Sequence, residues 1–306
     1  MAGKRPAVRM YPIAERQSLV HADHTLAPCP PLEGDGDIAF GAFLNALPDV
    51  LAAAGMRRLV ETWARCVREE RNVLFGFGGH VVKTGLGPWL KAALAKRYIT
   101  HLATNGSGII HDLELAYFGE TSEDVATALP QGRFGFARET QELFARATAN
   151  APGSGGLGEA VKAMVVADKP PYRDSSLIWA AAQESIPISV HVALGCDIVH
   201  MNPELDGEAL GAASLADFWA IADTVSHLQD GLFILAGSAV ILPEVFLKAV
   251  SVAINRGADL SGMTSAVLDF IRQYRARENV LCRPPGDSIE LIGHHEIWNM
   301  LWFIEF

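Results

Sequence analysis

Two kinds of hydrophobic pattern alternate along the chain. Short, nearly continuous apolar runs, typical of strands that are buried on both faces, occupy residues 73–77, 98–103, 188–193 and 232–241. Apolar residues at helical spacing occur between and around these runs, at 40–53, 56–70, 87–97, 122–128, 137–149, 175–185 and 215–228. This alternation predicts an α/β fold with a doubly wound, mostly parallel, Rossmann-like sheet over residues 37–306.

The first 36 residues have a different character. They are proline-rich and end in Pro-Cys-Pro-Pro-Leu-Glu-Gly-Asp-Gly. We expect an extended N-terminal arm, which either wraps a neighbouring subunit or is disordered.

Composition narrows the class of protein. The formal net charge of −10 argues against a nucleic-acid partner, which needs a basic surface. The four cysteines are far apart and form no CxxC pair, so free thiols in a reducing compartment are expected. No apolar core of a signal peptide and no uninterrupted span of eighteen apolar residues is seen, which predicts a cytoplasmic protein without a membrane segment.

The segment 98–114 carries the strongest functional signal. An apolar run leads into Thr104, Asn105, Gly106, Ser107 and Gly108, and titratable side chains follow. The two glycines permit positive φ angles and close approach of a ligand. Ligands of open α/β sheets bind beyond the carboxyl ends of the strands, so a site is one interpretation. A purely structural turn is the other.

The order of four segments resembles the deoxyhypusine synthase family. These segments are 104–112 (TNGSGIIHD), 75–85 (FGFGGHVVKTG), 176–188 (SLIWAAAQESIPI) and 232–240 (LFILAGSAV), and the resemblance covers roughly residues 70–300. The family uses NAD to oxidise spermidine and passes its aminobutyl group through a lysine imine. The resemblance therefore implies NAD as cofactor, a small-molecule amine (polyamine) substrate, and a homotetramer with sites at subunit interfaces.

The same resemblance implies which residues bind the cofactor. They are Gly78, Gly79, His80, Thr104, Asn105, Gly106, Ser107, Gly108, Asp197, Gly237 and Ser238. Asp197 suits a ribose hydroxyl or a substrate amine, and a helix N-cap is an equal alternative for it.

The chain departs from the family where catalysis is expected, as a divergent bacterial-type homologue would. By the resemblance, His294 stands in place of the catalytic lysine, and histidine has no primary amine to form an imine. His294 is therefore the predicted proton-transfer residue, with Glu296 to orient it. His111 replaces a polyamine-binding carboxylate and is the third catalytic candidate. Substrate contacts are expected from Asp112, Glu114 and Lys83.

Other motifs are weaker. Gly153, Gly155 and Gly158 have GxGxxG spacing, but no strand precedes them, which favours a loop. No histidine cluster has metal-ligand spacing, so no metal is predicted, although assembly in space from His80, His111 and His294 stays open. Arg275, Arg277 and Arg283 either bind an anionic substrate group or are solvated.

Three functions remain open at this point. The first is an NAD-dependent oxidoreductase or transferase acting on an amine without a lysine imine. The second is a non-redox hydrolase or lyase that uses the histidines directly or with a metal. The third is a ligand-binding homologue without turnover.

Overall fold

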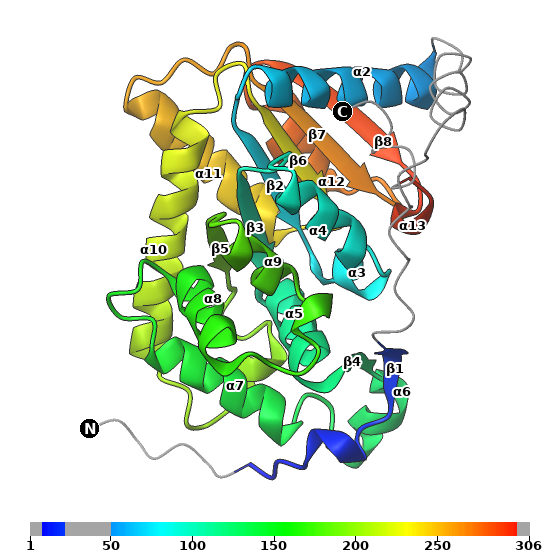
Figure 1. Cartoon of the computed structure of the whole chain (residues 1–306), viewed down its shortest axis with the longest axis vertical. Helices are drawn as coiled ribbons and strands as arrows, with labels where there is room; N and C mark the ends of the chain where they lie inside the picture. The colour runs from blue at the N-terminus through cyan, green and yellow to red at the C-terminus, as the bar shows by residue number, and fades with distance from the viewer. Residues whose placement is uncertain (1–7, 22–49, 299–306) are drawn as a thin grey trace.

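A computed structural model describes residues 8–21 and 50–298 (Figure 1). Most of the predicted helix at 40–53 and most of the N-terminal arm lie outside these ranges; residues 51–53 belong to the helix Leu51–Arg68. One six-stranded sheet dominates the described part. Its strands are β2 (Val73–Phe77), β3 (His101–Asn105), β5 (Ile188–His191), β6 (Leu232–Ala236), β7 (Thr264–Asp269) and β8 (Asp287–Ile292).

All neighbouring pairs of this sheet are parallel, in the spatial order β5-β3-β2-β6-β7-β8. Numbered by their order along the chain, the six strands run 3-2-1-4-5-6, which is the common order of dinucleotide-binding sheets. The chain reverses its winding direction between β2 and β6. The predicted doubly wound, parallel α/β sheet is confirmed.

Helices cover both faces of the sheet. They are α2 (Leu51–Arg68), α3 (Gly79–Lys83), α4 (Gly87–Ala95), α5 (Gly106–Phe118), α6 (Val125–Ala128), α7 (Arg138–Ala149), α8 (Leu157–Asp168), α9 (Leu177–Gln183), α10 (Gly207–Ser226), α11 (Ile241–Asn255), α12 (Tyr274–Ala276) and α13 (His295–Trp298). Single turns of other helix types lie at Ile13–Glu15, Leu129–Gln131, Arg173–Ser175, Ile198–Met201 and Arg277–Cys282.

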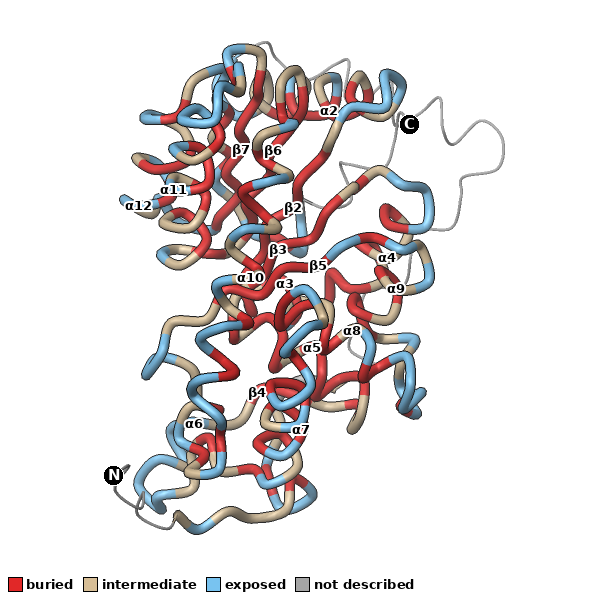
Figure 2. Tube along the Cα trace, turned by 90° about the vertical axis from the view of Figure 1, so that its left-hand side faces the viewer, coloured by how far each residue is buried: buried red, intermediate tan, exposed pale blue. Residues whose placement is uncertain are grey.

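Figure 2 shows that the strands of the sheet are largely buried. Alternate side chains enter two different cores, one on each face of the sheet. Phe75 and Ile234 belong to the core beneath α2 and α4, where Phe75 stacks on Trp63 with ring centroids 6.5 Å apart. Leu74 and Phe233 face the other core, beneath α10 and α11. This arrangement explains the continuous apolar runs of the sequence.

Several predicted boundaries are wrong. Residues 120–123 form a strand, β4 (Glu120–Glu123), before the short α6, where one helix was expected at 122–128. The strand expected at 232–241 ends at Ala236, because Gly237 turns the chain with φ +61°. The strand predicted at 98–103 is shifted to 101–105. The glycine-rich loop is followed directly by α8, which the sequence pattern did not predict.

The described part of the N-terminal segment packs on its own chain. β1 (Ser18–His21) pairs antiparallel with β4, and Tyr11 forms a bridge with Ala137. The division into an arm at 1–36 and a single domain at 37–306 stays a prediction, as does its contact with another subunit.

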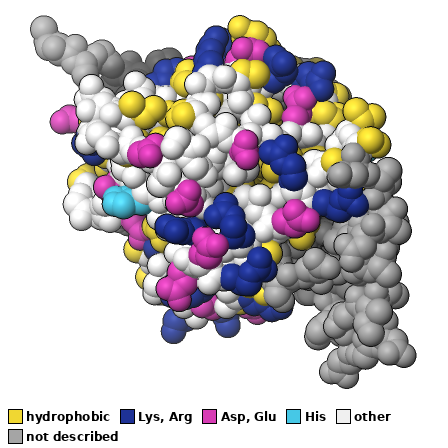
Figure 3. Space-filling view, turned by 90° about the horizontal axis from the view of Figure 1, so that it is seen from above, with side chains coloured by type: hydrophobic (Ala, Val, Ile, Leu, Met, Phe, Trp, Pro, Cys, Tyr) yellow, Lys and Arg dark blue, Asp and Glu magenta, His cyan; other side chains and the backbone are white. Residues whose placement is uncertain are grey.

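The described residues bear on two expectations from composition, the absence of a membrane segment and the state of the cysteines. None of the described helices has the length and apolar character needed to cross a membrane. Cys66, Cys196 and Cys282 are free thiols. On the face seen in Figure 3, basic and acidic side chains are interspersed, so this face carries no basic stripe. The absence of a nucleic-acid partner stays a prediction.

Candidate active site

Two glycine turns meet where the winding of the sheet reverses. Gly78 follows β2 and Gly237 follows β6, and the amide of Gly78 donates to the carbonyl of Ala236 at 3.0 Å. A Cβ on Gly78 would lie only 2.1 Å from the carbonyl oxygen of Gly237. Both turns therefore need glycine, and they bring the start of α3 next to the loop that leads into α11.

Free backbone donors lie at this junction. The amides of Gly79 and His80 open α3 and have no acceptor among the described residues. Across from them, Ser238 precedes α11, and its hydroxyl accepts from the amide of Leu242 at 3.4 Å. Unpaired amides at helix starts attract anions, so the junction of β2 and β6 fits a phosphate-bearing ligand.

A third turn joins β3 to α5. The side chain of Asn105 caps α5 by accepting from the amide of Gly108 at 3.0 Å and from the hydroxyl of Ser107 at 2.9 Å. The hydroxyl of Thr104 donates to the carbonyl of Phe77 at 2.9 Å, which ties β3 to β2. All of these residues lie at the carboxyl edge of the sheet, as the sequence predicted.

The glycines of this third turn serve close packing. Neither Gly106 nor Gly108 has a positive φ, so that part of the sequence argument is wrong. A Cβ on Gly106 would lie 2.2 Å from Oδ2 of Asp197, and one on Gly108 would lie 2.0 Å from Oγ1 of Thr104.

Asp197 has the capping role that was one of its two sequence interpretations, and its contact with a ribose hydroxyl or a substrate amine stays a prediction. It caps the turn Ile198–Met201 in a capping box with His200, whose Nδ1 accepts from the Asp197 amide at 3.3 Å. Its carboxylate also lies against the start of α5, beside Gly106. Burial raises the pKa of this carboxyl to about 6. Because this pKa is still below 7, the carboxyl is mainly ionised near pH 7, and a negative charge lies close to the start of α5.

A buried histidine faces the turn after β6. His295 is 1% exposed, and its Nε2 has no hydrogen-bond partner among the residues that the structure describes. Its ring lies 5.4 Å from that of His80, centroid to centroid, and His80 lies 5.1 Å from the ring of Phe270. Burial, followed by the charge of His80, lowers the pKa of His295 to about 4. The imidazole is therefore neutral near pH 7.

Asp269 completes this group from the end of β7. Its side chain is buried and accepts from the amide of Phe270 at 2.8 Å. Burial raises the pKa of Asp269 and lowers that of His80, while their mutual attraction opposes both shifts. The ends of β2, β6, β7 and β8 thus assemble two imidazoles and a carboxyl.

The predicted catalytic pair lies elsewhere on the same loop. The side chain of His294 is 64% exposed, and its Nδ1 lies 3.5 Å from Oε1 of Glu296, which is also largely exposed. His295, which sequence reasoning missed, is the histidine that faces Gly237. The adjacent His-His pair was the available signal. Neighbouring side chains at a helix start point in different directions, so the choice between them required the backbone geometry.

The predicted substrate carboxylates are engaged in holding the fold. Asp112 accepts from the hydroxyl of Ser176 at 2.6 Å and from the amide of Leu177 at 2.6 Å, and so caps α9. Burial raises the pKa of Asp112 to about 6 against these hydrogen bonds. Glu114 forms a buried ion pair with Arg16, with 2.5 Å between Nη1 and Oε1. Both roles depend on residues distant in sequence.

His111 and Lys83 differ from these carboxylates. His111 lies beside the glycine turn, since a Cβ on Gly79 would be 2.8 Å from its Cδ2. Lys83 ends α3 and is exposed. The predicted catalytic and substrate residues therefore fall into three groups. His111 lies beside the junction of β2 and β6, Asp112 and Glu114 hold the fold, and the exposed residues are His294, Glu296 and Lys83.

The remaining motifs have structural explanations. The amides of Leu157 and Gly158 donate to the carboxylate of Asp217, at 2.8 Å for Leu157, so the start of α8 after the GxGxxG run is already occupied. Arg275 pairs with Glu244, and Arg277 pairs with Glu278. Within residues 8–21 and 50–298, no group of three His, Cys, Asp or Glu side chains is arranged to hold a metal ion.

No protein-family model matches the sequence, and no curated protein matches it. Solved structures match its fold. A ternary complex of AgrE with ornithine and NAD+ is 11% identical with a TM-score of 0.56, covering 82% of this chain and 32% of AgrE. This chain thus spans about a third of the length of AgrE.

For two further structures, the matched region makes up a larger share of the other protein. A LOR/SDH-type protein from Methanococcus maripaludis S2 is 14% identical with a TM-score of 0.53, covering 84% of this chain and 70% of its own. A candidate deoxyhypusine synthase from Entamoeba histolytica is 11% identical with a TM-score of 0.53, covering 83% and 87%. At such identities the likeness shows the fold alone, and this is the fold that the sequence resemblance implied.

Proposed function

We propose that this chain binds NAD at the junction of β2 and β6 and is an enzyme acting on an amine-bearing small molecule. One observation carries the proposal. The 3-2-1-4-5-6 sheet brings the glycine turns after β2 and β6 together beside the buried Nε2 of His295, which has no hydrogen-bond partner in the described part of the chain. Open amides for a dinucleotide and a reactive polar group for a substrate thus share one edge of the sheet.

The fit to NAD rests on the backbone. The amides of Gly79 and His80 point from the start of α3 and would hold the pyrophosphate. Ser238, which precedes the longer α11, lies across the junction and adds a hydroxyl on the opposite side. NAD, when bound, supplies a hydride acceptor. The solved complex of AgrE with ornithine and NAD+ supports this assignment for the same fold.

The residues on the β6–β8 side suit an amine. The buried carboxylate of Asp269 attracts a cation, and the neutral rings of His80 and His295 offer hydrogen bonds to it. Because burial lowers the pKa of His295 to about 4, the ring stays neutral at pH 7. Its role is therefore to orient the substrate and to hold a proton only transiently. AgrE, which has this fold, was solved with ornithine, an amine, and this supports the same substrate class.

Lysine-imine chemistry forms no part of the proposal. The position that the resemblance assigns to the catalytic lysine holds His294, and Lys83 is on the surface. Aminoalkyl transfer by this chain would have to occur directly between bound molecules.

Calorimetric titration of the full chain with NAD+ and NADH tests the proposal. We expect micromolar binding, with a loss of about tenfold or more in G79A, because the added Cβ pushes on His111 and Ser107 at the cofactor turn. G211A is the matched control, since nothing lies within 4 Å of a Cβ at that position. Thermal melts of both variants report folding separately. If neither dinucleotide binds the unaltered chain, the proposal fails.

A further inference from the structure

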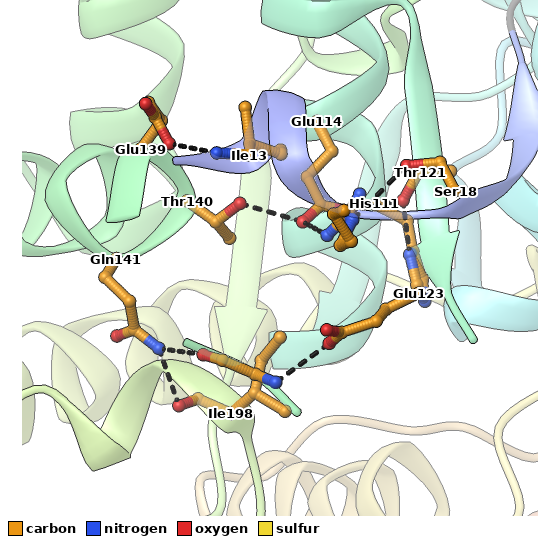
Figure 4. A network of polar contacts seen from close by, with 12 residues as sticks. Ile13, Ser18, His111, Glu114, Thr121, Glu123, Glu139, Thr140, Gln141 and Ile198 are labelled. Carbon is orange, nitrogen blue, oxygen red and sulfur yellow. Dashed lines mark hydrogen bonds and ion pairs between the residues drawn. The ribbon is translucent and has the colours of Figure 1, made fainter. Parts of the chain in front are cut away.

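A chain of polar contacts runs from the N-terminal segment to His111 on α5 (Figure 4). Its central member is Thr121, on β4. The Thr121 hydroxyl lies 2.7 Å from Nδ1 of His111 and 2.5 Å from Oε2 of Glu114. A hydroxyl has one hydrogen to donate, so the two contacts must differ in direction.

Glu114 settles the direction. Burial by itself raises its pKa, but the hydrogen bonds and charge of Arg16 bring the pKa below its ordinary value. Arg16 binds both carboxylate oxygens, at 2.5 and 3.0 Å, and the hydroxyl of Thr140 donates to Oε1 at 2.8 Å. An ionised carboxylate only accepts hydrogen bonds. Thr121 therefore donates to Glu114 and accepts from His111, which places a proton on Nδ1 of the imidazole.

The other ring nitrogen of His111 is then an acceptor. Burial lowers the pKa of His111 to about 4, so near pH 7 the ring carries a single proton. With that proton on Nδ1, Nε2 presents a lone pair. Nε2 has no partner among the described residues, and the neighbouring ring atom, Cδ2, faces Gly79. An obligate acceptor thus stands beside the cofactor turn.

We propose that Glu114 and Thr121 lock His111 in the Nδ1-protonated form, and that its Nε2 selects the 2′-hydroxyl of NAD over the 2′-phosphate of NADP. This step rests on the proposed cofactor binding. Sheets with this strand order usually bind the ribose hydroxyl through a carboxylate after the second strand. Here the second strand is β3, which ends in Asn105, and its side-chain oxygen already accepts from Gly108 and Ser107.

Charge supports the same choice. A hydroxyl donates to Nε2, whereas a 2′-phosphate presents mainly lone pairs and negative charge. The carboxylate of Asp197, beside Gly106, adds repulsion of a phosphate. Besides burial, two cations lower the pKa of His111, Lys83 and Arg16. Arg16 is paired with Glu114 and Lys83 lies exposed at the end of α3, so neither is placed to bind a 2′-phosphate at Nε2 of His111.

Nitrogen-15 NMR of histidine side chains tests the lock without any ligand. H111Q identifies the His111 signals among those of the ten histidines. We expect the unaltered chain to show the proton on Nδ1, and T121V to transfer a large share of it to Nε2. T140V is the matched control, since Thr140 contacts Glu114 and has no hydrogen bond to His111. A proton on Nε2 in the unaltered chain, or an unchanged tautomer in T121V, overturns the lock.

Titration with NAD+ and NADP+ tests the selection. We expect the full chain to prefer NAD+ by about tenfold or more, and T121V to lose most of that preference. T140V should retain it. NADP+ binding as tightly as NAD+ to the unaltered chain refutes the selection. Binding of neither dinucleotide refutes the proposed function and the selection together, while the NMR result still decides the lock.

Discussion

Nε2 of His295 lies directly over the turn at Gly237: a Cβ on Gly237 would be 3.2 Å from this nitrogen. Gly237 and His295 are 58 residues apart in the chain, and the parallel pairing of β6, β7 and β8 brings them together. This contact puts a buried imidazole where the sequence argument had placed its exposed neighbour, His294.

Replacement of His295 is expected to impair turnover. With ornithine or a polyamine and NAD+, H295N should form NADH about 100-fold more slowly than the unaltered chain, because a positioned histidine contributes at least that factor. H294N should stay within about threefold, since its side chain is 64% exposed. NADH absorbance measures both. A larger loss in H294N than in H295N would restore His294 as the catalytic histidine.

Arg16 is expected to be important for stability. R16M leaves the buried carboxylate of Glu114 without its ion-pair partner, and should lower the free energy of unfolding by about 3–5 kcal/mol. R58M is the control, because Arg58 and Asp287 are both largely exposed and 4.0 Å apart; it should change stability by less than about 1 kcal/mol. Urea unfolding measures both. Equal effects would contradict a buried pair.

Acid is expected to destabilise the fold through two core histidines. Burial lowers the pKa of His101 to about 4 and that of His191 to about 3. Below about pH 6.5 these two histidines are protonated in the unfolded chain but stay neutral in the folded chain. The free energy of unfolding therefore falls as the pH drops from 6.5 towards 4. Each histidine contributes up to about 1.4 kcal/mol per pH unit.

Urea unfolding at pH 7, 6 and 5 checks this pH dependence. H191Q removes one of the two groups. The slope of the free energy of unfolding against pH should therefore decrease by up to the contribution of one proton. A pH dependence that is the same in H191Q and in the unaltered chain would show that His191 does not resist protonation.

Asp217 is expected to stabilise the start of α8. D217A removes the acceptor of the Leu157 and Gly158 amides, and should cost about 1–3 kcal/mol. D223A on the same helix, which alters an exposed side chain, should cost less than about 0.5 kcal/mol. Because Asp217 already occupies this helix start, neither change should alter NAD affinity. Loss of NAD binding in D217A, with folding intact, would point to the GxGxxG loop as the cofactor site.

Local pattern was sufficient for much of the fold. The strand at 73–77 was predicted with its observed bounds, because a continuous apolar run followed by glycines has few other interpretations. The turns at Gly78, at Asn105 and Gly106, and at Gly237 were also predicted to share one edge. Parallel strands leave no choice in this, since their carboxyl ends all lie on the same side of the sheet.

The roles of the charged side chains were not accessible in the same way. Asp112, Glu114 and Asp197 have the same chemistry in the sequence, and their partners are 65, 98 and 91 positions away at Leu177, Arg16 and Gly106. Only the folded chain shows that the first caps a helix, the second holds the N-terminal segment, and the third lies at the start of α5.

The sequence alone determined the class of sheet and the edge at which we expect a ligand to bind. The spacing of hydrophobic residues and the positions of glycine turns are local properties, and they do not depend on how distant segments pack. Tertiary structure decided which histidine is buried, which carboxylates are already paired, and which nitrogen of His111 carries its proton. Those outcomes depend on burial and on hydrogen bonds between distant segments, and neither exists before the strands are brought together.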